Sequence, residues 1–147
     1  MENKYLNEAI IGNKKMLATY SSKGELQRLY FPERENRQYI NFFHTGVKVN
    51  NSDLIYLHDD INNVYKQYYD TDTNVLNTEV TNTYFNLKIV QTDCALIKED
   101  NVLLKKYTFI NDGKIDLDVG LYFHSELLSS ENNYVGCKVF DNGMIQY

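Results

Sequence analysis

Hydrophobic and polar residues alternate along much of the chain, and the clearest example is "KIDLDVGLYF" at positions 114–123. The odd-numbered positions of this segment from 115 onward are all apolar, and Asp116 and Asp118 stand between them. A period of two residues is typical of a strand that buries one face in an antiparallel sheet. The same alternation recurs in "FNLKI" at 85–89. Strands of this kind are therefore expected along much of the chain.

Short strand-like segments follow one another with turn signals between them. Strands are predicted near 5–11, 15–20, 25–31, 39–49, 53–58, 74–80, 83–91, 94–98, 102–110, 114–123 and 134–140. Many short strands at close spacing are typical of two packed antiparallel sheets. The pattern therefore predicts an all-β protein with the architecture of an antiparallel β-sandwich.

One segment departs from the two-residue period. In "DDINNVYKQYYD" at 59–70, apolar and aromatic side chains recur at the spacing that places them on one face of a helix. These side chains are Ile61, Val64, Tyr65 and Tyr68. The segment 59–70 is therefore the one predicted helix.

Three turns are predicted from residue types that tolerate unusual backbone angles. Gly24 closes "SSKG" at a point where a hairpin needs a positive φ. Asp112-Gly113 and Asn142-Gly143 are pairs that favour two-residue hairpin turns, so each is expected to join two antiparallel strands. Only a short return strand, Met144 to Tyr147, follows Asn142-Gly143, which predicts either a sandwich that is shortened at this end or a last strand that pairs in an unusual way.

Composition indicates one folded domain spanning 1–147. A chain of 147 residues has the usual size of a domain and can bury a core of its own. Aromatic residues make up 14% of the chain, which excludes the composition of a disordered protein. With 7 glycines and 1 proline, the loops must be built mainly from Asn, Asp and Ser.

The charge balance narrows the possible partners and location. The net charge of −5 argues against nucleic acid and against an anionic membrane surface, since both need a basic face. No apolar run approaches the ~20 residues of a membrane-spanning helix. The N-terminal segment has no signal-peptide pattern, because its apolar part is only Ala9 to Ile11. A cytoplasmic protein with reduced thiols at Cys94 and Cys137 is expected, although spacing does not exclude a disulfide between them.

Acidic segments do not match known catalytic or calcium-binding motifs. "DTDTN" at 70–74 begins like a calcium loop, but Val75 and Thr81 stand where that loop needs Gly and Glu. Paired carboxylates occur at Asp59-Asp60 and at Glu99-Asp100, and such pairs in polar loops are usually solvated turns. No catalytic residue is predicted from these segments.

The histidines do not follow the spacing of a structural zinc site. His44, His58 and His124 are far apart in the sequence, and no cysteine pair accompanies them. Either cysteine together with a histidine could form a nucleophile pair, but no local signature supports one. No metal and no cofactor is predicted.

Tyrosines are concentrated in "YKQYYD" at 65–70. An exposed tyrosine ring can stack on the apolar face of a sugar, so this segment is a candidate carbohydrate surface. Tyrosine also packs well at the rim of a core while its hydroxyl stays in water. The structural role is the preferred interpretation of the two.

A longer segment resembles a known enzyme family. "AIIGNKKMLATYSSKGELQRLYFPERENRQYINFFHTGV" is similar to the start of bacterial and archaeal members of glycoside hydrolase family 15, which are glucoamylase, glucodextranase and trehalase-like enzymes. The matching residues are Ile11, Gly12, Asn13, Ser22, Gly24, Tyr30, Phe31, Pro32, Glu35, Asn36, His44, Gly46 and Val47. Later segments, among them "IVQTDCALIKEDNVLLKKYTFIND" and "VFDNGMIQY", follow in the family's order. Two departures are that "RQYINFF" replaces a longer Gly/His-rich segment and that Lys105-Lys106 stand where the family often has Arg-Arg.

The resemblance implies a fold and a role. It covers only the N-terminal part of such enzymes, which is a β-supersandwich of the galactose-mutarotase type, and the catalytic (α/α)6 barrel with its two glutamates is absent from 1–147. It implies a non-catalytic domain that packs on the barrel of a glucan 1,4-alpha-glucosidase-like enzyme of polysaccharide degradation and stabilises it. The residues expected to face that barrel are Tyr30, Phe31, Pro32, Glu35, Asn36 and His44.

Two other functions stay open from the sequence. One is a carbohydrate-binding β-sandwich that uses tyrosine stacking on an α-glucan oligosaccharide. The other is a β protein that stands alone and assembles through an open sheet edge, since an uncovered edge strand is a template for pairing.

Overall fold

The computed structural model describes residues 9–31, 38–98, 102–128, 137–141 and 143–146, with the backbone alone for 137–140 and 143–146. No helix occurs among these residues. The strands are β1 (Ala9–Gly12), β2 (Leu17–Tyr20), β3 (Leu26–Tyr30), β4 (Ile40–Val49), β5 (Ile55–Tyr56), β6 (Asn63–Tyr69), β7 (Leu76–Asn82), β8 (Leu87–Ala95), β9 (Leu103–Asn111), β10 (Val119–Leu127), β11 (Cys137–Phe140) and β12 (Gly143–Gln146).

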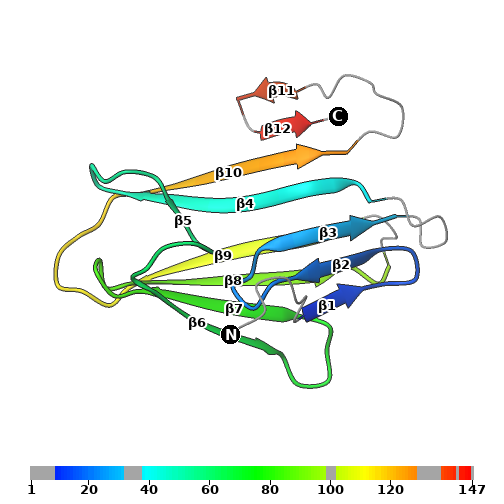
Figure 1. Cartoon of the computed structure of the whole chain (residues 1–147), viewed down its shortest axis with the longest axis horizontal. Helices are drawn as coiled ribbons and strands as arrows, with labels where there is room; N and C mark the ends of the chain where they lie inside the picture. Colours follow the sequence, from blue (N-terminus) through cyan, green and yellow to red (C-terminus); the bar gives the residue numbers. More distant parts are fainter. Residues whose placement is uncertain (1–8, 32–37, 99–101, 129–136, 142, 147) are drawn as a thin grey trace.

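The strands form two antiparallel sheets and a separate hairpin (Figure 1). In the first sheet the order is β1-β2-β3-β4-β10, and β5 also pairs with β4. The second sheet has the order β6-β7-β8-β9, and β11 pairs with β12. The expected all-β fold is confirmed, and the two sheets are arranged as in a β-sandwich.

The core between the sheets consists of two hydrophobic clusters. The first cluster joins Ile11 and Ile40 of the first sheet to Leu76 of the second. The second cluster joins Val47 of the first sheet to Ile89 of the second. Because each cluster contains buried side chains from both sheets, the inner faces of the two sheets pack directly against each other.

A polar layer separates the two clusters. On β8 the inward-facing residues change from apolar Ile89 to buried polar Gln91 and Asp93. On β4 the same change occurs between apolar Val47 and buried polar Thr45, two residues earlier in the sequence. We define the polar layer as Thr45, Thr78, Gln91, Asp93, Lys105 and Tyr107. Buried polar groups are costly unless they are hydrogen-bonded, so these side chains need partners within the layer or beside it, as Thr78 has in Gln67.

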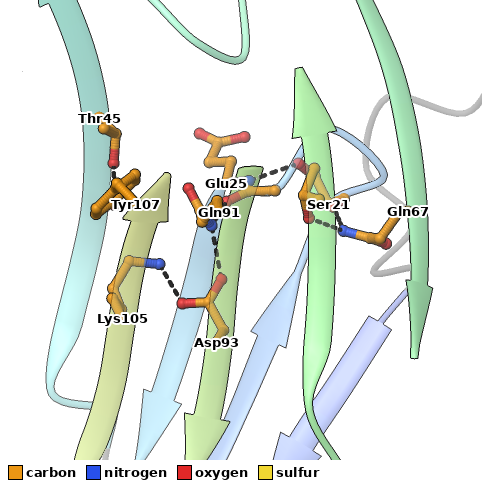
Figure 2. Close-up of polar contacts among 10 residues, drawn as sticks. Ser21, Glu25, Thr45, Gln67, Gln91, Asp93, Lys105 and Tyr107 are labelled. Carbon is orange, nitrogen blue, oxygen red and sulfur yellow. Dashed lines mark hydrogen bonds and ion pairs between the residues drawn. The ribbon is translucent and has the colours of Figure 1, made fainter. Parts of the chain in front are cut away.

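Figure 2 shows that the polar layer is bonded internally. Lys105 Nζ donates to Asp93 Oδ1 at 2.5 Å, and Asp93 is fully buried. Gln91 Nε2 donates to the other carboxylate oxygen of Asp93 and to the backbone carbonyl of Gly24, both at 2.7 Å. Thr45 Oγ1 and Tyr107 OH are 2.7 Å apart. The layer thus links β4, β8, β9 and the turn at Gly24 across the sandwich.

Aromatic rings surround the ammonium of Lys105. Its Nζ lies 5.1 Å from the ring centre of Tyr20 and 5.5 Å from that of Phe43. Burial lowers the pKa of Lys105, and the Asp93 carboxylate opposes that shift. The Tyr20 hydroxyl is buried, and burial together with the nearby Asp93 carboxylate raises the pKa of Tyr20 well above its usual value.

The predicted helix at 59–70 is wrong, because this segment contains β6. Tyr65 and Gln67 are half-buried toward the second sheet's inner face, whereas Val64, Lys66 and Tyr68 are exposed. Aromatic and β-branched residues favour strands, and each residue of β6 pairs with a residue of β7. Strand pairing therefore overrides the local helical spacing.

The predicted hairpin at Asp112-Gly113 is also wrong. β9 pairs with β8, whereas β10 pairs with β4 in the other sheet, so residues 112–118 form a crossover between sheets. β10 consequently begins at Val119 rather than near 114, and Ile115 is exposed. In the same region of the fold, the two strands predicted at 83–91 and 94–98 are one strand, β8.

The other two turns are confirmed. Gly24 has a φ of 77°, and a Cβ there would lie 2.8 Å from a side-chain carbon of Thr78, so glycine is required at this position. β11 and β12 pair as an antiparallel hairpin, in which Phe140 lies opposite Gly143 and Cys137 lies opposite Gln146. Asn142 lies outside the described residues. β11 and β12 have four residues each.

Candidate functional site

The outer face of the first sheet brings histidines and aromatic rings together. We call this surface the histidine face and define it as Glu25, Phe42, His44, Tyr56, His58 and His124. His124 on β10 lies directly opposite His44 on β4, and Tyr56 on β5 lies opposite Gly46. Cross-strand partners share one side of a sheet. On β4 the alternate residues Thr45 and Val47 are buried in the core, so His44 and its partners are on the side that faces away from the core.

Strand order explains how Glu25 joins this face. β10 lies along one edge of β4 and β3 along the other (Figure 1). β3 pairs with β4 at Phe43, and β5 pairs with β4 from Gly46. Glu25, just before β3, and His58, just after β5, therefore meet beside His44.

Distances within the histidine face are short. Glu25 Oε1 lies 2.9 Å from His44 Nε2 and 4.0 Å from His58 Nε2. The rings of His44 and His58 have centroids 4.3 Å apart, and Phe42 stacks on His44 at 4.8 Å. Burial is the main cause that lowers the pKa of His58, and the Glu25 carboxylate opposes this shift. A neutral imidazole is therefore favoured at His58.

Tyr56 and His124 form a second bonded pair on the same face. The Tyr56 hydroxyl lies 3.1 Å from His124 Nδ1. Their rings are nearly parallel, with centroids 6.3 Å apart. The pair lies beside the Glu25, His44 and His58 group and joins a half-buried ring, Tyr56, to an exposed ring, His124.

The spacing of the three histidines in the sequence did not indicate this cluster. One signal was present, because the strands predicted at 39–49 and 53–58 are close enough to form a hairpin. Extending the observed pairing of Gly46 with Tyr56 by two residues places His44 opposite His58. The partner Glu25 was not detectable, since its position depends on how β3 and β5 share one edge of β4.

The predicted interface residues that the structure describes divide into two groups. Tyr30 and Phe31 are half-buried at the end of β3, and the Tyr30 hydroxyl accepts a hydrogen bond from Arg28 Nη1 at 3.4 Å. His44 belongs to the histidine face. Tyr30 lies four residues along β3 from Leu26, which pairs with Phe43, so about 14 Å of strand separates Tyr30 from the histidine face. Pro32, Glu35 and Asn36 lie outside the described residues.

A groove of about 580 Å³ runs beside β6. It is lined by Ala9, Ser22, Lys23, Asn63, Val64, Tyr65, Gln67, Tyr68, Tyr69 and Leu76. All three tyrosines of "YKQYYD" thus lie along one groove. A channel with aromatic walls and amide and ammonium groups has the composition that binds polar rings such as sugars.

Two of the three groove tyrosines also have structural roles. The Tyr69 hydroxyl accepts from the backbone N–H of Ile10 and donates to its carbonyl, both at 2.8 Å, which ties β6 to β1. The Tyr65 hydroxyl donates to the carbonyl of Leu57 at 2.8 Å, and Lys23 Nζ lies 5.3 Å from its ring centre. Tyr68 is 38% exposed and Tyr69 is 44% exposed, but the Tyr68 hydroxyl donates to the Glu79 side chain and not to a backbone group, so Tyr68 is the tyrosine to replace in a test.

The acidic segments take turn roles. Asp60 Oδ1 accepts from the backbone N–H of Asn62 at 2.8 Å, and Asp70 Oδ1 accepts from Asn77 Nδ2 at 2.7 Å. Asp72 has a φ of 59°, as in a tight turn. Glu99-Asp100 lies outside the described residues. These carboxylates therefore support loops between strands.

The cysteines are not seen as a pair. Cys94 is a free, half-buried thiol on β8. The side chain of Cys137 lies outside the described part of the chain. In that described part, no helix has the length and apolar character needed to span a membrane.

Comparisons with protein-family models, with curated proteins and with solved structures found no match for this chain. Function must therefore be argued from the histidine face, the tyrosine groove and the sequence resemblance.

Proposed function

We propose that this protein is the non-catalytic N-terminal domain of a glucoamylase-like α-glucan hydrolase of the cytoplasm, and that it packs on the catalytic (α/α)6 domain and stabilises it. The sequence resemblance and the antiparallel all-β architecture support this proposal. The observation that carries it is the histidine face, a cluster of outward-pointing rings on the first sheet. Aromatic side chains with a polar rim are the composition of docking surfaces.

The position of Tyr122 extends the docking surface. Tyr122 on β10 lies opposite Gly46 and is 48% exposed, next to His124 on the same strand side. The space over Gly46 is filled by Leu54, since a Cβ at Gly46 would lie 3.0 Å from the Leu54 side chain. Rings at the centre of an interface carry much of its binding energy, so Tyr122 is the side chain to test.

The first test reads the coding sequence past the codon for Tyr147. We expect the frame to continue into a helix-rich segment with spaced glutamates. In that two-domain protein, Tyr122→Ser should weaken the domain contact by about 2 kcal/mol, as expected for an aromatic interface anchor. The measurement is the thermal unfolding midpoint of the two-domain protein together with hydrolysis of maltose.

Tyr84→Ser is the matched control. Tyr84 is 74% exposed in the connection between β7 and β8, away from the first sheet. Its loss should leave the midpoint of the two-domain protein unchanged, and both variants should leave the isolated domain folded. A stop codon after Tyr147, or equal effects of the two substitutions, would refute the docking proposal.

A second candidate function is favoured by the groove beside β6. Its three tyrosines support binding of an α-glucan oligosaccharide by ring stacking. We expect maltose or isomaltose at millimolar concentration to shift the NMR signals of the groove. Tyr68→Ala should weaken this binding by about 1 kcal/mol, the scale of one aromatic contact. Tyr122→Ala is the control on the other sheet, and absence of any shift with the unmodified protein removes this candidate.

A further inference from the structure

We propose that Glu25, His44 and His58 bind a divalent transition-metal ion, and that zinc fits the site best. The ligand atoms are one carboxylate oxygen and two imidazole nitrogens, and all three lie within 4.8 Å of one another. They come from three segments, before β3, on β4 and after β5, that converge on one edge of β4. The fold therefore assembles the ligand set from distant parts of the sequence.

The spacing of the ligand atoms suits a small ion. Zinc–nitrogen bonds of 2.0–2.1 Å in a tetrahedral site place neighbouring ligand atoms about 3.3 Å apart. Glu25 Oε1 lies 2.9 Å from His44 Nε2 and 4.0 Å from His58 Nε2, so the observed distances lie on both sides of that value. Small side-chain rotations are enough to surround one ion.

The ligand types select among metals. Calcium takes six to eight oxygen ligands, which one carboxylate and two imidazoles do not supply. Imidazole nitrogen suits zinc, copper and nickel, and two histidines with one glutamate form a known type of open zinc site. Three protein ligands leave a fourth position that is open to water.

The surroundings hold the ligands in place without closing the site. The side chains of Glu25, His44 and His58 are 24%, 24% and 19% exposed, so an ion can reach them from solvent. Phe42 stacks on the His44 ring, and Tyr56 packs edge-on against it with centroids 5.8 Å apart. Rings fixed by packing lose little freedom when they bind, which favours affinity.

The experiment is a titration of the untagged, metal-free protein with Zn²⁺ by calorimetry and with Co²⁺ by visible absorption. We expect one ion per chain and the absorption bands of cobalt in a low-symmetry site with nitrogen and oxygen ligands. Zinc at a hundredfold excess over its Kd should raise the folded-to-unfolded ratio about a hundredfold. Saturable 1:1 binding must be seen with the unmodified protein, and its absence overturns the proposal.

Variants identify the ligands. His58→Ala and Glu25→Gln should each weaken zinc binding by about 100-fold or more, beyond the usual cost of losing a supporting partner. His124→Ala is the matched control, because it removes a histidine of the same face whose Nδ1 is bonded to Tyr56. Circular dichroism checks that each variant folds, and Glu25→Gln keeps the size of the side chain if His58→Ala does not fold. An equal loss of affinity with His124→Ala would show general capture by surface histidines and overturn the site.

The metal site does not rest on the proposed docking function. Zinc binding is measured on this domain alone, whereas docking is measured on the two-domain protein with Tyr122→Ser. Either result can therefore fail while the other holds.

Discussion

Replacing Lys105 by methionine will destabilise the domain by about 3–5 kcal/mol, because it leaves the buried Asp93 carboxylate without its cation. Asp93 is fully buried, and Lys105 Nζ donates to it inside the polar layer. The remaining donor is Gln91, a neutral amide that cannot balance the charge. Urea unfolding of the variant, followed by far-UV circular dichroism, measures the change.

Two companion variants separate the charge from the loss of packing. Lys106→Met changes the neighbouring residue of β9, which is exposed, and should alter the free energy of unfolding by less than about 0.5 kcal/mol. The double variant Lys105→Met with Asp93→Leu should recover most of the stability, since replacing both partners of a buried pair by apolar groups is often neutral. A loss below about 1 kcal/mol for Lys105→Met alone would contradict the expected isolation of a buried charge.

Alkaline pH will unfold the domain through two buried tyrosines. Burial raises the pKa of Tyr20 and of Tyr107, and the nearby Asp93 carboxylate adds to both shifts, whereas the bond to Thr45 opposes the shift at Tyr107. An unfolded tyrosine loses its proton near pH 10. Because both folded pKa values lie above that, their stabilising contribution is complete below about pH 10 and is lost as pH rises through the folded values.

Lys105 faces the same tyrosines, and over a limited pH range it changes the stability of the domain in the opposite direction. Its folded pKa is lowered, so stability from this group increases with pH until the unfolded lysine titrates near pH 10.4. Above about pH 10.5 only the tyrosines contribute among these groups, and each decreases the folded-to-unfolded ratio about tenfold per pH unit. The two together should decrease it about a hundredfold per unit.

Tyr107→Phe tests this prediction directly. The variant loses one titrating hydroxyl and keeps the ring, so the fall of its folded-to-unfolded ratio above pH 10.5 should be about tenfold smaller per pH unit than in the unmodified protein. Tyr84→Phe, at an exposed tyrosine, should leave the steep dependence unchanged. Denaturant unfolding at a series of pH values measures both slopes, and identical slopes for Tyr107→Phe and the unmodified protein would exclude Tyr107 as a source.

Contacts with the polar layer also explain why glycine is needed at position 24, which is far in the sequence from β7 and β8. Gly24 accepts a hydrogen bond from Gln91 through its carbonyl, and its Cα lies against Thr78. Gln67 reaches the same region, since its Nε2 donates to Thr78 Oγ1 at 3.0 Å and to the Ser21 carbonyl at 2.9 Å. The β2–β3 turn is therefore hydrogen-bonded to β8 and β6 of the opposite sheet and packs against Thr78 of β7.

The sequence by itself determined the fold class, most strands and the turn at Gly24. These features depend on local physics, since a two-residue period identifies a half-buried strand and a positive φ requires glycine. The same local information failed at 59–70, where helical spacing is overridden by pairing with β7. It also failed at Asp112-Gly113, because a turn sequence does not reveal which sheet the next strand will join.

Only the tertiary structure decided the candidate sites. Glu25, His44 and His58 meet because β3 and β5 share one edge of β4, and Asp93 finds Lys105 because β8 pairs with β9 in one particular register. The tyrosines at 65–70 were visible in the sequence, but their groove depends on the approach of the β2–β3 turn to β6. The physical reason is common to all three, because side chains become neighbours through strand order and register, which single-residue patterns do not encode.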